Sequence, residues 1–231
     1  MVEKCTDVHT VTEHTDFGPW TLAGKHVVPG RGAVNAVSDT SEVRLSAGAT
    51  LALDTDYEKV GALAGAGTVA FSPIGGDNVL GLATTNNTAA FTGAVTGRGT
   101  LEISGEGTQA FDGADLSGVT SLVLKGGTVT GTASVAGDLT VDFAGGATAL
   151  EVSGIKALTV TGEPKIALPK DLTEVFKLTL FTYESIDASS KTCLESIQVE
   201  EVPQSYRATL SVTDTACVLS LGKDGLLLIL K

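Results

Sequence analysis

The chain has 231 residues, of which 42% are hydrophobic and 18% charged, and a formal net charge of −12 at pH 7. This much apolar content with so few charges excludes a disordered chain, and the length suffices to bury a substantial core. The excess of 27 acidic over 15 basic residues argues against nucleic acid and anionic membrane surfaces as partners, because both are bound through clustered Lys and Arg. The longest apolar run, at 225–230, is far shorter than the ~20 residues of a spanning helix, so we expect no membrane insertion.

Residues 1–40 contain no internal repeat, and we expect an N-terminal lead or cap in this part of the chain. Four side chains here, those of Cys5, His9, Glu13 and His14, are of types that bind zinc. Their spacing matches none of the common zinc-finger patterns. A solvated segment is therefore the preferred interpretation, and we assign no metal or cofactor to it.

The centre of the chain repeats with a period of twenty residues. The stretches GAGTVAF, TNNTAAF and GEGTQAF begin at Gly65, Thr85 and Gly105. A second strand-like segment with alternating apolar residues follows half a period later, as in TLEIS at 100–104. Glycine this frequent disfavours helical repeats, since each Gly inside a helix costs about 1 kcal/mol. Twenty residues match one coil of a β-solenoid, whose coils must stack to bury their inner faces, so we predict a solenoid over residues 41–162.

In-register stacking of these coils predicts three columns of equivalent residues. The first is a ladder of threonines with Cα atoms about 4.8 Å apart, formed by Thr68, Thr88, Thr108 and Thr128. The second is a core stack of aromatic rings, formed by Phe71, Phe91 and Phe111. The third is a turn residue with positive φ, which Gly and Asn tolerate, at Gly67, Asn87, Gly107 and Gly127. The threonines suggest one of two roles, either a flat outward array, as in ice-binding solenoids, or hydroxyls that cap backbone groups. One Thr per coil is too sparse for a paired array and favours the capping role.

Two kinds of motif suggest ligand sites on the coils. GAGT and GRGT resemble parts of phosphate-binding loops, but a strand follows each of them where a helix is needed, and no Lys is in place. Oxygen ligands for calcium are offered by Asp54, Asp56, Glu58, Asp77 and Asn78. These residues lack the repeated Asp spacing of calcium-binding β-rolls. We interpret both kinds of motif as turns and assign no metal.

A catalytic site would need carboxylates, or carboxylates with Arg or Lys, gathered on one face, as in β-helices that cleave polysaccharides. The candidates are Glu102, Asp142 and Arg98. The stretch 61–162 holds only eight acidic and three basic residues, and charges on neighbouring coils do not obviously share a column. We therefore expect solvated faces and assign no catalytic residue.

The composition changes where the repeat ends. Of 28 Gly, 21 lie in residues 61–162 and only two follow them. DLTE at 171–174 predicts one helical turn, and several strand-like runs come after it. We expect residues 163–231 to form a separate β element that caps the solenoid, because an uncovered sheet edge promotes aggregation. Cys193 and Cys217 are either paired in a disulfide or two small buried apolar residues.

The stretches LAGAGTVAF and FTGAVTGRGTLEISGEGTQAFDGA resemble the autotransporter-associated β-strand repeat of bacterial surface proteins. The resemblance covers about residues 42–221 and is clearest over 63–113. It implies an all-β fold, a right-handed β-helix of about 20 residues per coil with a C-terminal β capping element, in an exported and surface-linked protein. The family shares no catalytic residues, so none is carried over to this chain.

These observations lead us to expect a noncatalytic structural or adhesive module, a rigid spacer or display surface that meets a surface glycan or a host or cell-surface protein. The alternative is a carbohydrate-active β-helix that binds or cleaves a polysaccharide. A deep groove lined by carboxylates favours the alternative, and a flat uncharged flank favours the spacer. The first residues lack the apolar segment of a signal peptide, so the chain is either cytosolic or part of a longer exported protein. Composition favours the second, and the expected location is secreted or at the cell surface.

Overall fold

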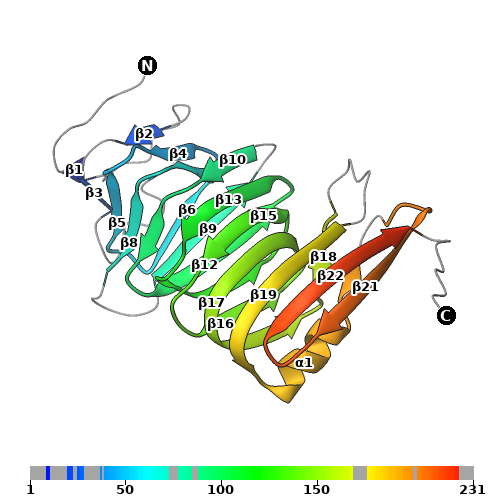
Figure 1. The fold of residues 1–231 in the computed structure, drawn as a ribbon. Helices are drawn as coiled ribbons and strands as arrows, with labels where there is room; N and C mark the ends of the chain where they lie inside the picture. Colours follow the sequence, from blue (N-terminus) through cyan, green and yellow to red (C-terminus); the bar gives the residue numbers. More distant parts are fainter. Residues whose placement is uncertain are drawn as a thin grey trace, which may run out of the picture.

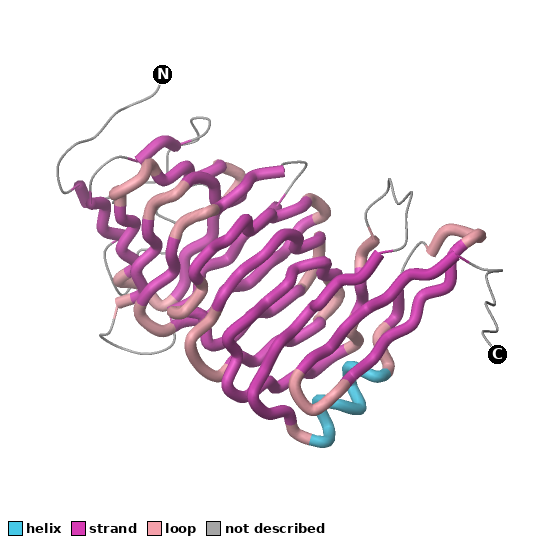
Figure 2. The backbone as a smooth tube through the Cα atoms, viewed as in Figure 1, coloured by secondary structure: helices cyan, strands magenta, loops and turns pink. Residues whose placement is uncertain are grey.

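The fold is a β-solenoid of about six turns with about 20 residues per coil, closed at one end by a hairpin and a short helix (Figure 1). The computed structural model describes residues 9–10, 20–22, 25–28, 37, 39–72, 78–84, 88–168, 176–199 and 202–223. Consecutive strands are joined by tight corners, so that the backbone winds as a stack of parallel coils (Figure 2). The prediction of a β-solenoid with this period is confirmed.

The coils present three faces, each a stack of parallel strands. Face 1 contains β4 (Glu42–Leu45), β7 (Ala62–Gly65), β10 (Thr88–Phe91) and the first parts of β13 (Thr108–Asp115), β15 (Thr128–Ser134) and β17 (Ala147–Gly162). Face 2 contains β5 (Thr50–Leu53), β8 (Thr68–Phe71), β11 (Ala94–Thr96) and the following parts of β13, β15 and β17. Face 3 contains β6 (Tyr57–Val60), β9 (Asn78–Thr84), β12 (Gly99–Gly105), β14 (Val119–Leu124), β16 (Leu139–Phe143) and the end of β17.

Three short strands precede the first complete coil. They are β1 (His9–Thr10), β2 (Trp20–Leu22) and β3 (Lys25–Val28). β2 pairs with β4 and β3 pairs with β5, so the parallel stacking continues into the N-terminal part of the chain. Whether residues 1–40 act as a cap stays a prediction.

The core fills the interior of the coils, because alternate side chains of every strand point inward. On face 3 one inward column is occupied by Leu80, Leu101, Leu122, Val141 and Val160. The next is occupied by Val60, Leu82, Ile103, Leu124 and Phe143. Similar apolar residues therefore lie above one another, and no coil buries its inner face without its neighbours.

The threonine ladder forms, but with one member misplaced. Thr88 pairs with Thr108 and Thr108 with Thr128, as predicted. Thr68 instead lies on face 2, where it pairs with Thr50 and Ala94, so its assignment to the ladder was wrong.

The physical reason is a change of phase after β8. The chain must still complete face 3 through β9 before it returns to face 1, so Gly65 pairs with Phe91, 26 residues later. Thr68–Phe71 therefore lies one face away from Thr88–Phe91, although the two segments are twenty residues apart.

The aromatic stack is also shorter than predicted. Phe91 and Phe111 pair and are fully buried, with ring centroids 6.3 Å apart. Phe71 is buried too, but on face 2 opposite Leu53. The prediction that Phe71 lies in the Phe91 column was wrong because of the same change of phase after β8.

A buried amide side chain replaces backbone hydrogen bonds between strands at the point where the coil phase changes. Among the described residues, β10 pairs with β7 only through Phe91 and Gly65. Gln109, fully buried on β13, reaches across to Leu63 of β7. Its Oε1 accepts from the Leu63 N–H at 3.0 Å, and its Nε2 donates to the Leu63 carbonyl at 3.0 Å. The side chain thus makes the two bonds that a neighbouring strand would otherwise supply.

The positive-φ turn residue was assigned two places too late in two coils. Gly65 and Gly105 adopt φ of 90° and 93°, whereas Gly67 and Gly107 are not left-handed. Gly127 does adopt positive φ, and Asn87 lies outside the described residues. Gly67 is needed for a different reason: a Cβ there would stand 2.7 Å from the Ala49 carbonyl oxygen.

The C-terminal part continues the solenoid and then turns back on it. β18 (Lys165–Ile166) and β20 (Gln198–Val199) extend face 1, and β19 (Phe176–Ile186) pairs parallel with β17. β22 (Ala216–Lys223) pairs antiparallel with β19, and β21 (Tyr206–Val212) pairs antiparallel with β22. The strand-like runs expected after DLTE are present as β19, the short β20, β21 and β22, while DLTE itself and the apolar run at 225–230 lie outside the described residues. The domain boundaries at 40 and 162 stay predictions.

A helix that the sequence did not predict covers the last strand of face 3. α1 (Ala188–Glu195) begins after Asp187, whose carboxylate accepts from the Ser189 and Ser190 N–H groups. Hydrogen bonds from the hydroxyls and N–H groups of these two serines lower the pKa of Asp187. The buried Ser190 Oγ accepts from the Val160 N–H at 2.8 Å, so α1 satisfies part of the open edge of β17.

The two C-terminal cysteines are free, so the disulfide alternative was wrong. Cys217 is buried in the core on β22. Cys193 is half-buried on α1, and its Sγ lies 3.4 Å from the Gly162 carbonyl oxygen, to which the thiol donates. Cys193 therefore contacts the same edge of β17 as Ser190.

Candidate functional site on face 3

The outer surface of face 3 collects the charged residues that sequence reasoning singled out. Register places Glu102 beside Val123 and Val123 beside Asp142, so the two acids occupy one outward column. The expectation that such charges share no column is therefore corrected. Two coil spacings of about 4.8 Å separate their backbones. Arg98 lies elsewhere, exposed at the corner before β12.

Each of the two acids is already engaged. Lys125 Nζ lies 2.7 Å from Glu102 Oε2, and Thr161 Oγ1 donates to Asp142 Oδ1 at 3.0 Å. The hydrogen bond to Glu102 and its negative charge raise the pKa of Lys125. Both carboxylates thus have a partner on the neighbouring coil, which suits a structural role on the surface.

Tyr57 lies over the glycine in the same column and was not identified from the sequence. A Cβ at Gly81 would stand 2.9 Å from the Tyr57 hydroxyl oxygen, so the missing side chain makes the space that the phenol occupies. Burial raises the pKa of Tyr57, and the negative charge of Glu102 adds to this, while Lys125 opposes it. Tyr57, Glu102 and Lys125 therefore form one polar group that spans four successive coils, which we call the Tyr57 cluster.

A second ion pair borders the Tyr57 cluster. Lys59 Nζ lies 3.7 Å from Asp39 Oδ2, and the charge of Asp39 also raises the pKa of Tyr57. The other oxygen of Asp39, Oδ1, is buried and has no hydrogen-bond partner in the described part of the chain. Polar groups therefore continue from the Tyr57 cluster to this end of face 3.

The residues considered for calcium do not converge. Asp54 and Asp56 are exposed, whereas Glu58 is fully buried and accepts from the Val37 N–H at 2.8 Å. Asn78 is buried and donates to the Ser72 carbonyl at 2.7 Å, and Asp77 lies outside the described residues. Glu58 and Asn78 thus serve the fold.

The proposed zinc ligands cannot be compared with the structure. Cys5, Glu13 and His14 lie outside the described residues, and for His9 only the backbone pairing of β1 is described. Within the described ranges, no group of three or more His, Cys, Asp or Glu side chains is placed to hold a metal ion.

The glycine turns do not offer a phosphate site. GAGT leads into β8 and GRGT into β12, so each is followed by a strand. In the first turn the N–H groups of Ala66 and Gly67 both donate to the Leu45 carbonyl, at 3.0 and 3.2 Å. These amides are already used between coils and do not point at a ligand.

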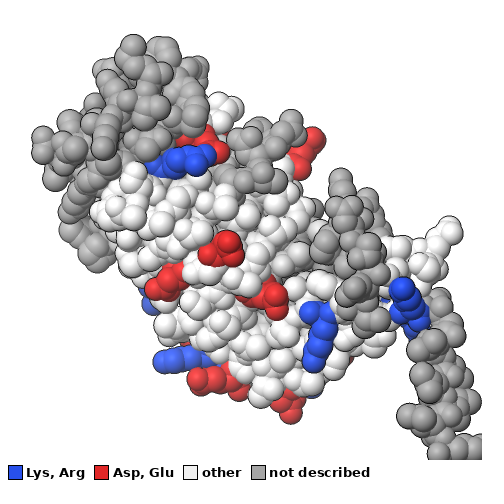
Figure 3. All heavy atoms as spheres, turned by 45° about the horizontal axis from the view of Figure 1, so that its top comes forward, with Lys and Arg blue, Asp and Glu red and all other residues white. Residues whose placement is uncertain are grey.

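Parts of the outer rows of faces 1 and 2 carry small uncharged side chains, although face 1 also carries the Arg44–Glu42 ion pair on β4 and the face 2 row continues to the exposed Asp115. On face 1, between β13 and β17, they are Thr108, Ala110, Thr128, Thr130, Ala147 and Ala149. On face 2, between β5 and β11, they are Thr50, Ala52, Thr68, Ala70, Ala94 and Thr96. On the side of the molecule drawn in Figure 3, charged side chains stand singly or in small groups on a largely uncharged surface.

Comparison with protein-family models, curated proteins and solved structures found no match to this chain. The described residues include no helix with the length and apolar character needed to span a bilayer.

Proposed function

We propose that this chain is a noncatalytic structural or adhesive module of an exported bacterial surface protein, serving as a rigid spacer or display surface. The observation that carries this proposal is the pair of uncharged rows of Thr and Ala on parts of faces 1 and 2. Such rows offer backbone-level contact area without charges or nucleophiles. The resemblance of residues 63–113 to the autotransporter-associated repeat supports the same conclusion and the location outside the cell.

The engagement of the acids on face 3 also supports a noncatalytic role. A carboxylate pair about two coils apart falls near the spacing of inverting glycosidases, roughly 6.5–9.5 Å between carboxyl groups. Such an enzyme needs one carboxyl as a proton donor and the other free to activate water. Glu102 is instead ion-paired with Lys125, and Val123 stands between it and Asp142.

The second candidate is glycan binding without cleavage at the Tyr57 cluster. An aromatic ring beside a carboxylate and an ammonium group combines an apolar surface with hydrogen-bond donors and acceptors, as sugar binding requires. A glycan or a protein of a cell surface would be the partner of the spacer, and a glycan alone would be the partner of this second candidate.

A glycan array combined with a polysaccharide cleavage screen separates these possibilities. The first proposal expects no cleavage, and any glycan binding should survive Tyr57→Ala. The second proposal expects glycan binding that is abolished by Tyr57→Ala. Thr159→Ala, a change elsewhere on face 3, should leave that binding intact. Release of reducing ends by the wild-type protein, lost in Glu102→Gln, would overturn both.

A further inference from the structure

The hairpin that closes the solenoid ends in a strand with a free edge. Of the described strands, only β22 pairs with β21, which is seven residues long and runs without a register shift. Half of its backbone groups point away from β22, because an antiparallel ladder alternates its hydrogen bonds. The cap thus covers the last coil and presents a new edge in its place.

This edge has little of the protection by which proteins block strand pairing. Edge strands are usually protected by several charged side chains, by Pro, by bulges or by inward-pointing charges. β21 has no Pro and one charged residue, Arg207, which points outward. Its inward row is apolar and only partly buried, and consists of Tyr206, Ala208, Leu210 and Val212.

We propose that β21 pairs antiparallel with β21 of a second copy of this chain, about a two-fold axis at Thr209. In this register Tyr206 faces Val212 and Ala208 faces Leu210, so the two apolar rows join into one. Arg207 faces Ser211 and avoids its own symmetry mate. All seven residues find a partner, which no other antiparallel register of two identical strands achieves.

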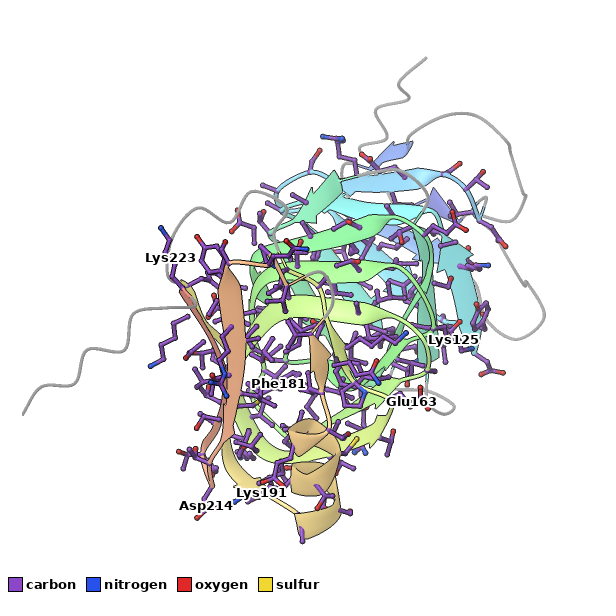
Figure 4. All side chains as sticks on the ribbon, turned by 90° about the vertical axis from the view of Figure 1, so that its right-hand side faces the viewer. Lys125, Glu163, Phe181, Lys191, Asp214 and Lys223 are labelled. Carbon is purple, nitrogen blue, oxygen red and sulfur yellow. The ribbon has the colours of Figure 1, made fainter. Side chains whose placement is uncertain are left out.

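The charges of the hairpin favour this orientation. β21 itself carries one charge, that of Arg207, so charge repulsion within the paired strands is limited to this residue. Lys223 and Asp214 lie at opposite ends of the hairpin (Figure 4). Asp214 is already ion-paired with Lys191 of α1, at 3.0 Å. Antiparallel pairing keeps Arg207 away from its symmetry mate, whereas in-register parallel pairing would place the two Arg207 side chains side by side.

The expected dimer is isologous and weak, because one strand per copy buries less than the ~1,200 Å² of a stable interface. It would join two solenoids at their C-terminal ends and present their side faces in pairs. This inference rests on the hairpin alone and holds whichever proposed function is correct.

Disulfide trapping in the full chain tests the register. At the two-fold axis the two Thr209 Cα atoms would be about 4.5–5.5 Å apart, within the range that a disulfide spans. Thr209→Cys should therefore form a covalent dimer under mild oxidation. Ser211→Cys, equally exposed on the same strand, lies opposite Arg207 and should not. The wild-type chain measures the background from its native cysteines.

An added charge opposite Arg207 tests the partner. In sedimentation experiments on the full chain, Ser211→Lys, which places a like charge opposite Arg207 of the other copy, should weaken dimerisation about threefold or more, the size of a cross-strand charge effect, and Ser211→Glu should strengthen it. Circular dichroism would confirm that each variant is folded. The proposal would be overturned by a wild-type chain that stays monomeric at high concentration. That result is expected if residues 224–231 or another protein cover β21. Equal cross-linking of Thr209→Cys and Ser211→Cys would also overturn the proposal.

Discussion

Phe91 and Phe111 pack edge to face in the centre of the solenoid, with their ring planes at 90°. Both rings are fully buried, and the column continues with Gly65 on one side and Gly131 on the other. Two large rings are thus accommodated between two coils that contribute no side chain at that point. The packing of the interior depends on which residue each coil places in this column.

Replacing Phe111 by Ala should destabilise the protein by roughly 3–5 kcal/mol, because the cavity adjoins another buried ring and cannot collapse readily. Urea unfolding monitored by circular dichroism would measure the change. Asp112→Ala, at the exposed neighbouring position, is the control and should stay within about 0.5 kcal/mol. A loss below 1 kcal/mol for Phe111→Ala would contradict inward stacking.

Gly131→Ala should also be strongly destabilising. Its φ is 98°, and a Cβ would stand 1.7 Å from the Phe111 carbonyl oxygen, so the coil must shift to admit a methyl group. We expect a loss of at least about 1–3 kcal/mol, the cost of a strained backbone conformation. Gly137→Ala is the matched control, because no atom lies within 4 Å of its added Cβ. Thermal unfolding of the two variants should differ clearly, and equal midpoints would refute the stacking around Phe111.

Gln109→Leu should disrupt the junction where the coil phase changes. The substitution leaves the Leu63 N–H and carbonyl buried without their 3.0 Å partners, and each unsatisfied group costs about 1–3 kcal/mol. Gln198→Leu, at an exposed position in β20, should have little effect. Hydrogen exchange gives an independent check, since the Leu63 amide should lose protection in Gln109→Leu and keep it in the control.

The C-terminal hairpin should lose stability in alkaline solution. Burial raises the pKa of both Tyr183 and Cys217 to about 12, from ordinary values of 10.0 and 9.0. Between pH 9 and 12 the folded state therefore binds more protons than the unfolded state, and the free energy of unfolding falls as pH rises. Below pH 9 these two groups should contribute no pH dependence.

Tyr183→Phe isolates one of the two contributions. The variant loses the 2.8 Å hydrogen bond from the Tyr183 hydroxyl to the Thr213 carbonyl, which should cost about 0.5–1.5 kcal/mol at neutral pH. Its unfolding free energy should then decline less steeply between pH 9 and 12 than that of the wild type. An unchanged slope would show that the phenol does not titrate with folding.

A shortened chain that ends at Gly162 should associate or precipitate, while the full chain remains dispersed or forms only the weak dimer. Removing residues 163–231 uncovers the edge of β17 that β19 and the Ser190 hydroxyl now satisfy. An exposed edge of a parallel sheet that carries apolar residues is prone to pair with the edge of another chain. Light scattering at matched concentrations would measure this. A monodisperse 1–162 chain would show that the C-terminal element is not a cap.

The sequence by itself determined the solenoid, its period and the residue types of its core. Alternation of apolar and small residues specifies strands with one buried face, and recurrence at twenty residues specifies coils that stack. The pairing of Thr88, Thr108 and Thr128 followed directly from that period, because between residues 88 and 131 each coil has the same length.

Only the tertiary structure decided where the period fails and what lies on the surface as a result. The coil that includes β9 is longer than the coils after it. The sequence repeat alone therefore cannot reveal that Thr68 and Thr88 occupy different faces. The Tyr57 cluster was hidden for the same reason, since its three residues are brought together by offsets of 21 and 22 residues between neighbouring coils. Helix α1 was missed because its own amphipathic pattern is weak. Its eight residues are held in place mainly by tertiary contacts, namely the hydrogen bond to Val160 and the packing on β17. Stacking energy is shared between coils, so the register that maximises it is a property of the assembled solenoid and of no single repeat.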